Sequence, residues 1–310
     1  MHAVLNAALP IFALIFTGYV CGRCQILSPA ATDSLNRFAV YLALPALMFL
    51  AMSRITPDQA AQVGFALAFA GSIAITFALG FALSRWRGHR VATASIEGLD
   101  ASYSNVGFMG IPLCLLVFGA DSLPAAIITT LFTACVLFLA AIAIIEIDVH
   151  RGASPWLTAR KVGRALIGNP LLLGPVAGLA VGLSGRGLLD PVERFMSLLG
   201  GAASPCALVC IGLFLAQERV AARDAPSIGL LVGLKLLVQP AVTALLVFYV
   251  FHVPPAWSRP AVLLSALPIG SGPFTIAKLY GLQPGVTSGA ILVSHVVSVL
   301  TVSILVAYLA

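Results

Sequence analysis

Charged side chains are scarce in this sequence. Only 9% of its 310 residues are Asp, Glu, Lys or Arg, whereas 60% are hydrophobic, and the mean hydropathy is +1.05. A soluble protein of this length must cover its surface largely with polar and charged side chains, and eleven acidic and seventeen basic residues are too few for that. The composition therefore indicates an integral membrane protein.

Other absences exclude further classes. No Lys or Arg precedes the first apolar stretch and no clear cleavage site lies before Arg23, which is typical of a retained first helix and not of a signal peptide. The absence of a Gly-rich nucleotide loop argues against an ATP-driven pump. The absence of a Gly-x-Gly-Asp motif argues against an intramembrane enzyme, and we expect neither enzymatic activity nor a cofactor. The net charge of +6 does not indicate nucleic acid, because the basic residues lie in short gaps between apolar runs.

Ten apolar runs are candidate membrane spans, so the expected fold is an all-α integral membrane protein. Crossing ~30 Å of hydrocarbon takes about 20 residues, and the second run is short unless its helix includes Asp33 to Arg37. The ninth and tenth runs are separated by Lys278 alone, and the eighth contains Lys235. The runs are residues 1–22, 38–53, 59–84, 101–120, 122–145, 165–185, 195–217, 225–251, 260–277 and 279–310.

The basic residues predict the orientation of these spans. Three gaps are rich in Lys and Arg, and such gaps are typically cytoplasmic. We therefore expect a multi-pass protein of the inner (cytoplasmic) membrane with both termini outside. The three gaps contain Arg85, Arg87 and Arg90, then Arg151, Arg160, Lys161 and Arg164, then Arg219 and Arg223, whereas the opposite gaps contain Arg54, Arg186, Arg194 and Arg259.

The two halves of the chain share a pattern at an offset near 160 residues. The sequence Asp-x-x-x-Arg-Phe opens the second span at Asp33 and the seventh at Asp190, and an Arg lies seventeen residues after both Asn6 and Asn169. These matches predict a first repeat at 1–148, a cytoplasmic linker at 149–164 and a second repeat at 165–310. Because each repeat has an odd number of spans, the two copies are expected to be inverted.

The fourth and ninth spans contain helix-breaking residues near their centres. Proline removes a backbone donor and glycine tolerates unwound geometry, so both helices are expected to break there. Non-helical backbone at that depth occurs beside protein or a water-filled cavity. Kinks and close packing are the alternative interpretation. The helix-breaking residues are Gly110 and Pro112 in the fourth span, and Pro268 and Pro273 in the ninth.

Three sequence motifs resemble those of a known transporter family. They are Leu35-Asn36-Arg37-Phe38 running into Tyr41 to Pro45, then Gly168-Asn169-Pro170, then Gly272-Pro273-Phe274-x-x-Ala277-Lys278-x-Tyr280. The chain resembles the auxin efflux carrier (AEC) family along essentially its whole length.

The resemblance implies ten helices, with a scaffold of spans 1, 2, 6 and 7 that also forms a homodimer. A moving core of spans 3–5 and 8–10 would carry organic anions, as in an elevator-type secondary transporter, and spans 4 and 9 would cross where they unwind. The plant carriers have Asn-Pro-Asn at the first crossing and a long central loop, whereas this chain has Tyr103-Ser104-Asn105 and only about residues 148–164. A small mono- or dicarboxylate is therefore a better candidate than auxin.

Two facing helix N-termini would suit a carboxylate, because their free N–H groups and dipoles attract anions. Side-chain donors at the crossings would add to them, although Asn105 has the alternative role of capping the broken helix. The predicted substrate-binding residues are Tyr103, Ser104, Asn105 and Gly107 in the fourth span and Gly270, Ser271 and Gly272 in the ninth.

Asp100 and Glu97 precede the first crossing at helical spacing, which makes them candidates for proton coupling, with an interfacial position as the alternative. Lys278 is a candidate for steering anions or for anchoring span nine at the cytoplasmic surface. Lys235 and Glu146 are expected to be anchors or a pair. His295 is expected to be a hydrogen-bonded packing residue, with a proton relay as the alternative. Cys21 and Cys24 have no second cysteine pair or histidine beside them, so they are weak support for a metal site.

Two other transport functions stay open from the sequence. A sodium-coupled carrier of the bile acid type shares the expected architecture by resemblance, but it would need carboxylate or amide ligands at both crossings, and span nine offers none. A passive anion channel is the other alternative, and it would conduct far faster than a carrier.

Overall fold

The computed structural model describes residues 9–149, 170–185, 187–217, 224–282 and 284–309. These residues are almost entirely helical, and their sole strand-like pairing is an isolated bridge between Ser104 and Ile269. The elements of the first half are α1 (Leu9–Arg23), α2 (Pro29–Phe38), η2 (Ala39–Ala43), α3 (Leu44–Ser53), α4 (Pro57–Ala60), α5 (Val63–Trp86), α6 (Val91–Ser102), η3 (Val106–Gly110), α7 (Ile111–Phe118), η4 (Ala120–Ser122), α8 (Leu123–Leu131), η5 (Phe132–Leu137) and α9 (Phe138–Val149). Those of the second half are α11 (Pro170–Ser184), α12 (Asp190–Gly201), α13 (Ala203–Gln217), α14 (Ala225–Gly233), η7 (Leu234–Val238), α15 (Gln239–Leu245), η8 (Leu246–Val250), α16 (Pro255–Ser265), α17 (Gly272–Leu279) and α18 (Gly285–Leu309).

Several of these elements join end to end into long apolar rods. Six rods among the described residues are long and apolar enough to cross a membrane, and this agrees with the expected all-α integral membrane class. They are Pro29–Ser53, Pro57–Trp86, Ala120–Asp148, Asp190–Gln217, Ala225–Val250 and Gly285–Leu309, and shorter apolar helices cover Leu9–Arg23, Val106–Phe118 and Pro170–Ser184.

The second apolar run gains its length from a capped start outside the run. Ser28 accepts a hydrogen bond from the backbone N–H of Ala31, and Pro29 occupies the first turn, where a missing N–H costs nothing. The helix then continues through Asp33 and Arg37 to Ser53. The charged residues that precede the apolar run therefore lie in the same helical rod as the run.

The predicted bounds of the fourth and ninth spans were wrong at their first ends. The fourth begins at Val91 and not at Ala101, because Glu97 and Asp100 are buried inside α6 and do not belong to a connection. The ninth begins at Pro255, five residues before the predicted start, and continues past Arg259. Ending a span at each charged residue fails where that residue is buried or lies along the helix.

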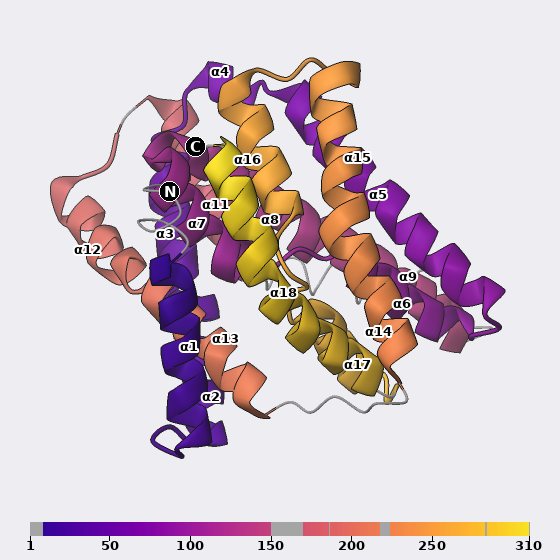
Figure 1. The fold of residues 1–310 in the computed structure, drawn as a ribbon. Coiled ribbons are helices and arrows are strands. Elements are labelled where there is room, and N and C mark those ends of the chain that lie inside the picture. The colour runs from indigo at the N-terminus through magenta and orange to yellow at the C-terminus, as the bar shows by residue number, and fades with distance from the viewer. Residues whose placement is uncertain (1–8, 150–169, 186, 218–223, 283, 310) are drawn as a thin grey trace.

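Two helix pairs approach each other closely through glycine. α1 packs along α13, where an added Cβ at Gly18 would collide with the carbonyl of Val209. α3 packs along α11, where a Cβ at Gly178 would collide with the carbonyl of Phe49. Glycine is required at both positions because the facing backbone leaves no room for a side chain. In Figure 1, α1, α3, α12 and α13 lie together on the left, apart from α5, α14 and α15 on the right.

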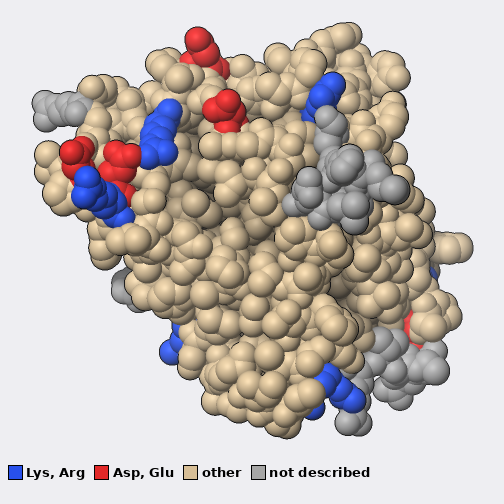
Figure 2. Space-filling view, turned by 60° about the vertical axis from the view of Figure 1, so that its left-hand side comes forward, with Lys and Arg blue, Asp and Glu red and all other residues tan. Residues whose placement is uncertain are grey.

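Charged side chains gather toward the two ends of the bundle. Figure 2 shows Lys, Arg, Asp and Glu near the upper and lower edges of this face, with a broad band of other residues between them. α4 and the end of α18 lie at the upper end of the bundle in Figure 1, and α2 and α17 lie at the lower end. Such a belt is the surface that a bilayer requires.

Several residues used in the sequence analysis lie outside the described residues, and so does the predicted linker 149–164 except Val149. They are Asn6, Arg151, Arg160, Lys161, Arg164, Gly168, Asn169, Arg186, Arg219 and Arg223. The predicted orientation and repeat boundaries stay predictions.

Candidate functional site

The two interrupted helices meet at their interruptions. α6 ends at Ser102 and η3 begins at Val106, while α16 ends at Ser265 and α17 begins at Gly272. The non-helical segments pair as a short antiparallel bridge, in which Asn105 N donates to Pro268 O at 2.9 Å and Gly270 N donates to Tyr103 O at 3.0 Å. Some of the backbone groups freed by one break are thus satisfied by the other, since buried peptide groups require partners.

Two helix N-termini leave the bridge, one on each chain segment. The first backbone N–H groups of a helix have no partner within it, and they carry a partial positive charge of about half an elementary charge. In η3 these include the N–H groups of Gly107 and Phe108, because the first helical bonds come from Met109 and Gly110. In α17 they include those of Gly272 and Phe274, since Thr275 makes the first bond. Such ends suit an anion.

Two cavities adjoin the bridge. The volume of each lies at the lower end of the range common for small-molecule sites. The first cavity, of about 300 Å³, reaches from η3 to η5 and α9. The second cavity, of about 320 Å³, reaches from the bridge to α13 and α18. Both also contact α2 and α17. The residues common to the two linings are Asn36, Asn105, Phe108, Ser271 and Thr275.

Asn105 lies between the two cavities with only 5% of its surface exposed. Its Nδ2 lies 3.2 Å from Nε2 of His295, whose Nδ1 lies 2.8 Å from Ile291 O. Because a carbonyl accepts only, Nδ1 carries the imidazole proton and Nε2 accepts from Asn105. The amide therefore joins the bridge to α18 and keeps its second N–H for another acceptor. His295 also lines the second cavity, so its packing role stays a prediction.

Tyr103 explains the two glycines that flank Ser271. A Cβ at Gly270 would lie 2.9 Å from Cε1 of the Tyr103 ring, and a Cβ at Gly272 would lie 2.5 Å from its Cζ. The ring and Gly272 line the first cavity, whereas the buried Gly270 is not among its lining residues. Ser104 and Gly107 line the same cavity, and Ser271 lines both. The two glycines are needed where they are because Tyr103 covers them.

The four helix-breaking residues have different positions. Pro268 lies within the break, and Pro273 lies in the first turn of α17, where its missing N–H leaves nothing unsatisfied. Gly110 and Pro112 lie in helical backbone beyond the break. Since Pro112 cannot donate to the residue four before it, the preceding turn widens, and Ile111 N donates to Val106 O five residues back.

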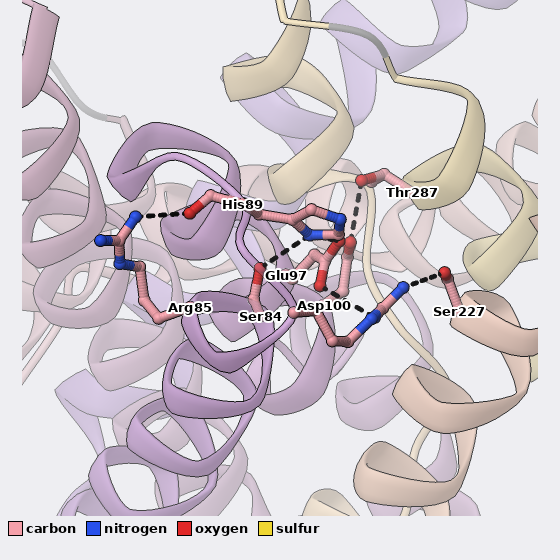
Figure 3. A network of polar contacts seen from close by, with 8 residues as sticks. Ser84, Arg85, His89, Glu97, Asp100, Ser227 and Thr287 are labelled. Atoms are coloured by element: carbon pink, nitrogen blue, oxygen red, sulfur yellow. Dashed lines mark hydrogen bonds and ion pairs between the residues drawn. The ribbon is translucent and has the colours of Figure 1, made fainter.

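Asp100 is completely buried one turn before the bridge. Its Oδ2 accepts from the Thr287 hydroxyl at 2.8 Å, while its Oδ1 has no hydrogen-bond partner among the described residues. Glu97, on the same helix, lies 3.4 Å from Arg87 Nη1 and 3.0 Å from His89 Nδ1. Figure 3 shows these groups joining the α5–α6 connection to α14 and α18. Both acids are buried within the protein, and the choice between proton coupling and an interfacial position stays a prediction.

Two lysines have distinct surroundings. Lys278 is exposed, lies 4.7 Å from the centre of the Phe274 ring and lines the second cavity. Lys235 is buried and donates from Nζ to Ser265 O at 2.7 Å and Leu267 O at 2.6 Å. The expected surface anchor or pair with Glu146 is therefore wrong for Lys235, and Glu146 instead accepts from the Tyr280 hydroxyl at 2.6 Å. Sequence analysis missed the contacts of Lys235 because their acceptors are backbone carbonyls about thirty residues away.

Gln239 is a second residue that sequence analysis missed. Its Nε2 donates to Ser102 O at 3.0 Å, and its Oε1 lies 3.4 Å from Ser104 Oγ. Lys235 and Gln239 are four residues apart on one rod, so their side chains share a face. Two polar residues at that spacing in an otherwise apolar span were the sequence signal that could have identified them.

Cys21 and Cys24 lie at and just beyond the end of α1, and no group of three metal-binding side chains occurs among the described residues.

Comparisons with known proteins agree with this architecture. The family model described as "Membrane transport protein" matches residues 3–306. A "Putative malonate transporter" of Rhizobium meliloti (strain 1021) is 33% identical over 304 residues, which are 98% of this chain and 95% of that protein. An "Uncharacterized transporter" of Methanothermobacter thermautotrophicus is 26% identical over 255 residues, which are 77% of this chain and 76% of that protein.

These proteins are transporters and not enzymes, and the match covers the helices on both sides of the bridge. The chain is therefore a multi-pass membrane transport protein that belongs to the auxin efflux carrier family.

Proposed function

We propose that this protein is a secondary active transporter of a small organic anion, with a mono- or dicarboxylate bound at the bridge between the two broken helices. The observation that carries the proposal is the meeting of the η3 and α17 N-termini beside two cavities lined by Asn105 and Ser271. The relative named as a malonate transporter supports a carboxylate substrate. We take malonate as the first compound to test.

In this proposal the bound carboxylate accepts from the N–H groups at the start of η3 and α17. Asn105 donates its second amide N–H and Ser271 adds its hydroxyl. Ser104 donates its single hydroxyl proton to the substrate by turning away from Gln239 Oε1, which accepts it in the structure. Tyr103 closes one side of the site, and Gly107, Gly270 and Gly272 permit the close approach of ring, backbone and substrate. Lys278 attracts anions into the second cavity.

The proposed layout is ten membrane spans in two inverted repeats, 1–148 and 165–310, joined by the linker 149–164. The close pairs α1 with α13 and α3 with α11 support a rigid scaffold of spans 1, 2, 6 and 7. This scaffold is the proposed homodimer interface. The core of spans 3–5 and 8–10 then moves as an elevator. The position of both cavities between α2, which is a scaffold element, and α17, which is a core element, supports this division. The protein lies in the inner membrane with both termini outside.

Protons are the proposed coupling ion. The carboxyl group of Asp100 is buried one turn from the bridge with one oxygen unpaired among the described residues, so it is placed to bind a proton. Glu97, three residues earlier on the same helix, pairs with the Arg87 and His89 side chains of the α5–α6 connection (Figure 3). A proton carried by either acid compensates one negative charge of the substrate.

Two measurements on purified protein test this function. A panel of mono- and dicarboxylates should raise the melting temperature, because a ligand that binds only the folded state stabilises it. In proteoliposomes, a stabilising carboxylate inside should accelerate uptake of the same labelled compound, since a carrier exchanges its substrate. Currents far above carrier turnover would favour the anion channel, and no effect of any carboxylate in either assay would refute the proposal.

A further inference from the structure

Lys235 has no acidic partner in the part of the chain that the structure describes. Its side chain is 0% exposed, within η7 of the α14–α15 rod. The ion pairs among the described residues involve Arg54, Arg87 and His89, and none involves Lys235. Burying an ammonium group without a partner is strongly unfavourable, because the charge loses its hydration. The surrounding structure must therefore compensate for this charge in another way.

The compensation comes from the end of a broken helix. Ser265 O and Leu267 O, which accept from Lys235 Nζ at 2.7 and 2.6 Å, are backbone carbonyls at the C-terminal end of α16 and just beyond it. A helix C-terminus carries about half a negative elementary charge, which favours a cation. In transporters built from discontinuous helices, such carbonyl ends are where a coupling Na⁺ is coordinated. Here the ammonium group of Lys235 occupies that place.

The C-terminal end of α6, which corresponds to that of α16, is bound by a neutral side chain. Gln239, four residues after Lys235 on the same rod, donates from its amide to Ser102 O at 3.0 Å. One helix face therefore holds both C-terminal ends of the crossing, one with an ammonium group and one with a neutral amide. The two N-termini and two C-termini at the crossing contribute about half a charge each and cancel. When Asp100 is protonated, Lys235 leaves a net charge of about +1.

We propose that Lys235 is the built-in cation of the crossing. It fixes the end of α16, it gives the neighbouring site the positive charge that selects an anion, and it takes the position of a coupling sodium ion. Lys235 is thus a positioning and selectivity residue that acts through the Ser265 and Leu267 carbonyls. This inference rests on the proposed function, because it places the anion site at the bridge.

The parent protein provides the first test. Calorimetric titration with malonate, in NaCl and in choline chloride at equal ionic strength, should give the same dissociation constant in both salts. Tighter binding in NaCl would overturn the inference, because the parent would then still require the ion that Lys235 replaces. If neither malonate nor any other carboxylate of the panel binds, the proposed function is refuted, and this inference falls with it.

The second test separates charge from structure. Lys235→Gln keeps a donor but loses the charge, whereas Lys235→Arg keeps both. Electrostatic energy is proportional to ligand charge. Lys235→Gln should therefore lower the affinity for the monoanion monomethyl malonate about tenfold and the affinity for the dianion malonate about a hundredfold. Lys235→Arg should retain the parent's ratio of the two affinities. Equal losses for both probes in Lys235→Gln, or no loss, would overturn the inference while leaving the proposed function intact.

Gln239→Leu is the matched control, since it removes the neutral donor from the α6 end. It should lower the melting temperature without changing the ratio of malonate to monomethyl malonate affinity. A ratio that falls in Gln239→Leu as far as in Lys235→Gln would show that loss of either helix end has the same effect, and would overturn the role of the Lys235 charge. If Lys235→Gln does not fold, the comparison of salts on the parent still decides the inference.

Discussion

Replacing Asn105 by Ala removes two interactions, one present in the structure and one proposed. The first is the hydrogen bond from Asn105 Nδ2 to His295 Nε2 at 3.2 Å, whose loss leaves a buried acceptor unsatisfied at a cost of about 1–3 kcal/mol in stability. The second is the donor to the substrate carboxylate, a charge-assisted bond of about 1.5–3 kcal/mol. We therefore expect a lower melting temperature together with a roughly tenfold to hundredfold loss of carboxylate affinity.

Ser294→Ala is the matched control for this experiment. The Ser294 hydroxyl accepts from Ile269 N at 3.1 Å, so it supports the other strand of the bridge through a buried bond and lines neither cavity. It should lower the melting temperature by a similar amount and leave the affinity unchanged. Both quantities are measured on the same purified samples, by thermal unfolding in detergent and by titration with malonate. A folded Asn105→Ala protein that binds as tightly as its parent would refute the substrate role of the amide and leave only its support of the bridge.

Three further predictions concern other parts of the molecule. Asp100→Asn should abolish the stimulation of uptake by a pH gradient while exchange at equal pH continues, and persistent stimulation in proteoliposomes would remove Asp100 from the coupling. Trp86→Cys, at the exposed end of α5, should react with impermeant thiol reagents from the cytoplasmic side alone, so labelling of intact cells would reverse the proposed orientation. Gly178→Leu should lower the melting temperature strongly, because its side chain would collide with the Phe49 carbonyl on α3, whereas Gly201→Leu, with nothing within 4 Å of its Cβ position, should not.

Local sequence predicted the helix breaks but not where the broken helices begin. Glycine and proline near the centres of both spans predicted broken helices, and Pro268 lies within its break. The first break, at residues 103–105, comes before Gly110 and Pro112, which lie in helical backbone. The start of α6 at Val91 could not be predicted from local sequence. Glu97 and Asp100 are tolerated inside the protein only through their contacts with Arg87, His89 and Thr287. Partners distant in sequence decide whether a charge ends a membrane helix.

The roles of Tyr103 and Lys235 also depend on contacts across the crossing. Sequence placed Gly270 and Gly272 at a break, which is a local property, but the Tyr103 ring that requires them comes from the other half of the chain. Lys235 was expected to be an anchor or a partner of Glu146. Its actual acceptors, the Ser265 and Leu267 carbonyls, exist only because α16 ends inside the protein.

The two sides of the crossing are similar in backbone but opposite in charge. Asp100 is an acid one turn before the first break, and Lys235 is a base on the carbonyls of the second. In the proposed mechanism, an anion at the bridge is attracted by Lys235 and repelled by ionised Asp100, so protonating Asp100 strengthens anion binding. By linkage, the anion must favour the proton to the same degree. Coupling between proton and substrate then follows from their fixed proximity and needs no direct contact between Asp100 and the bound carboxylate.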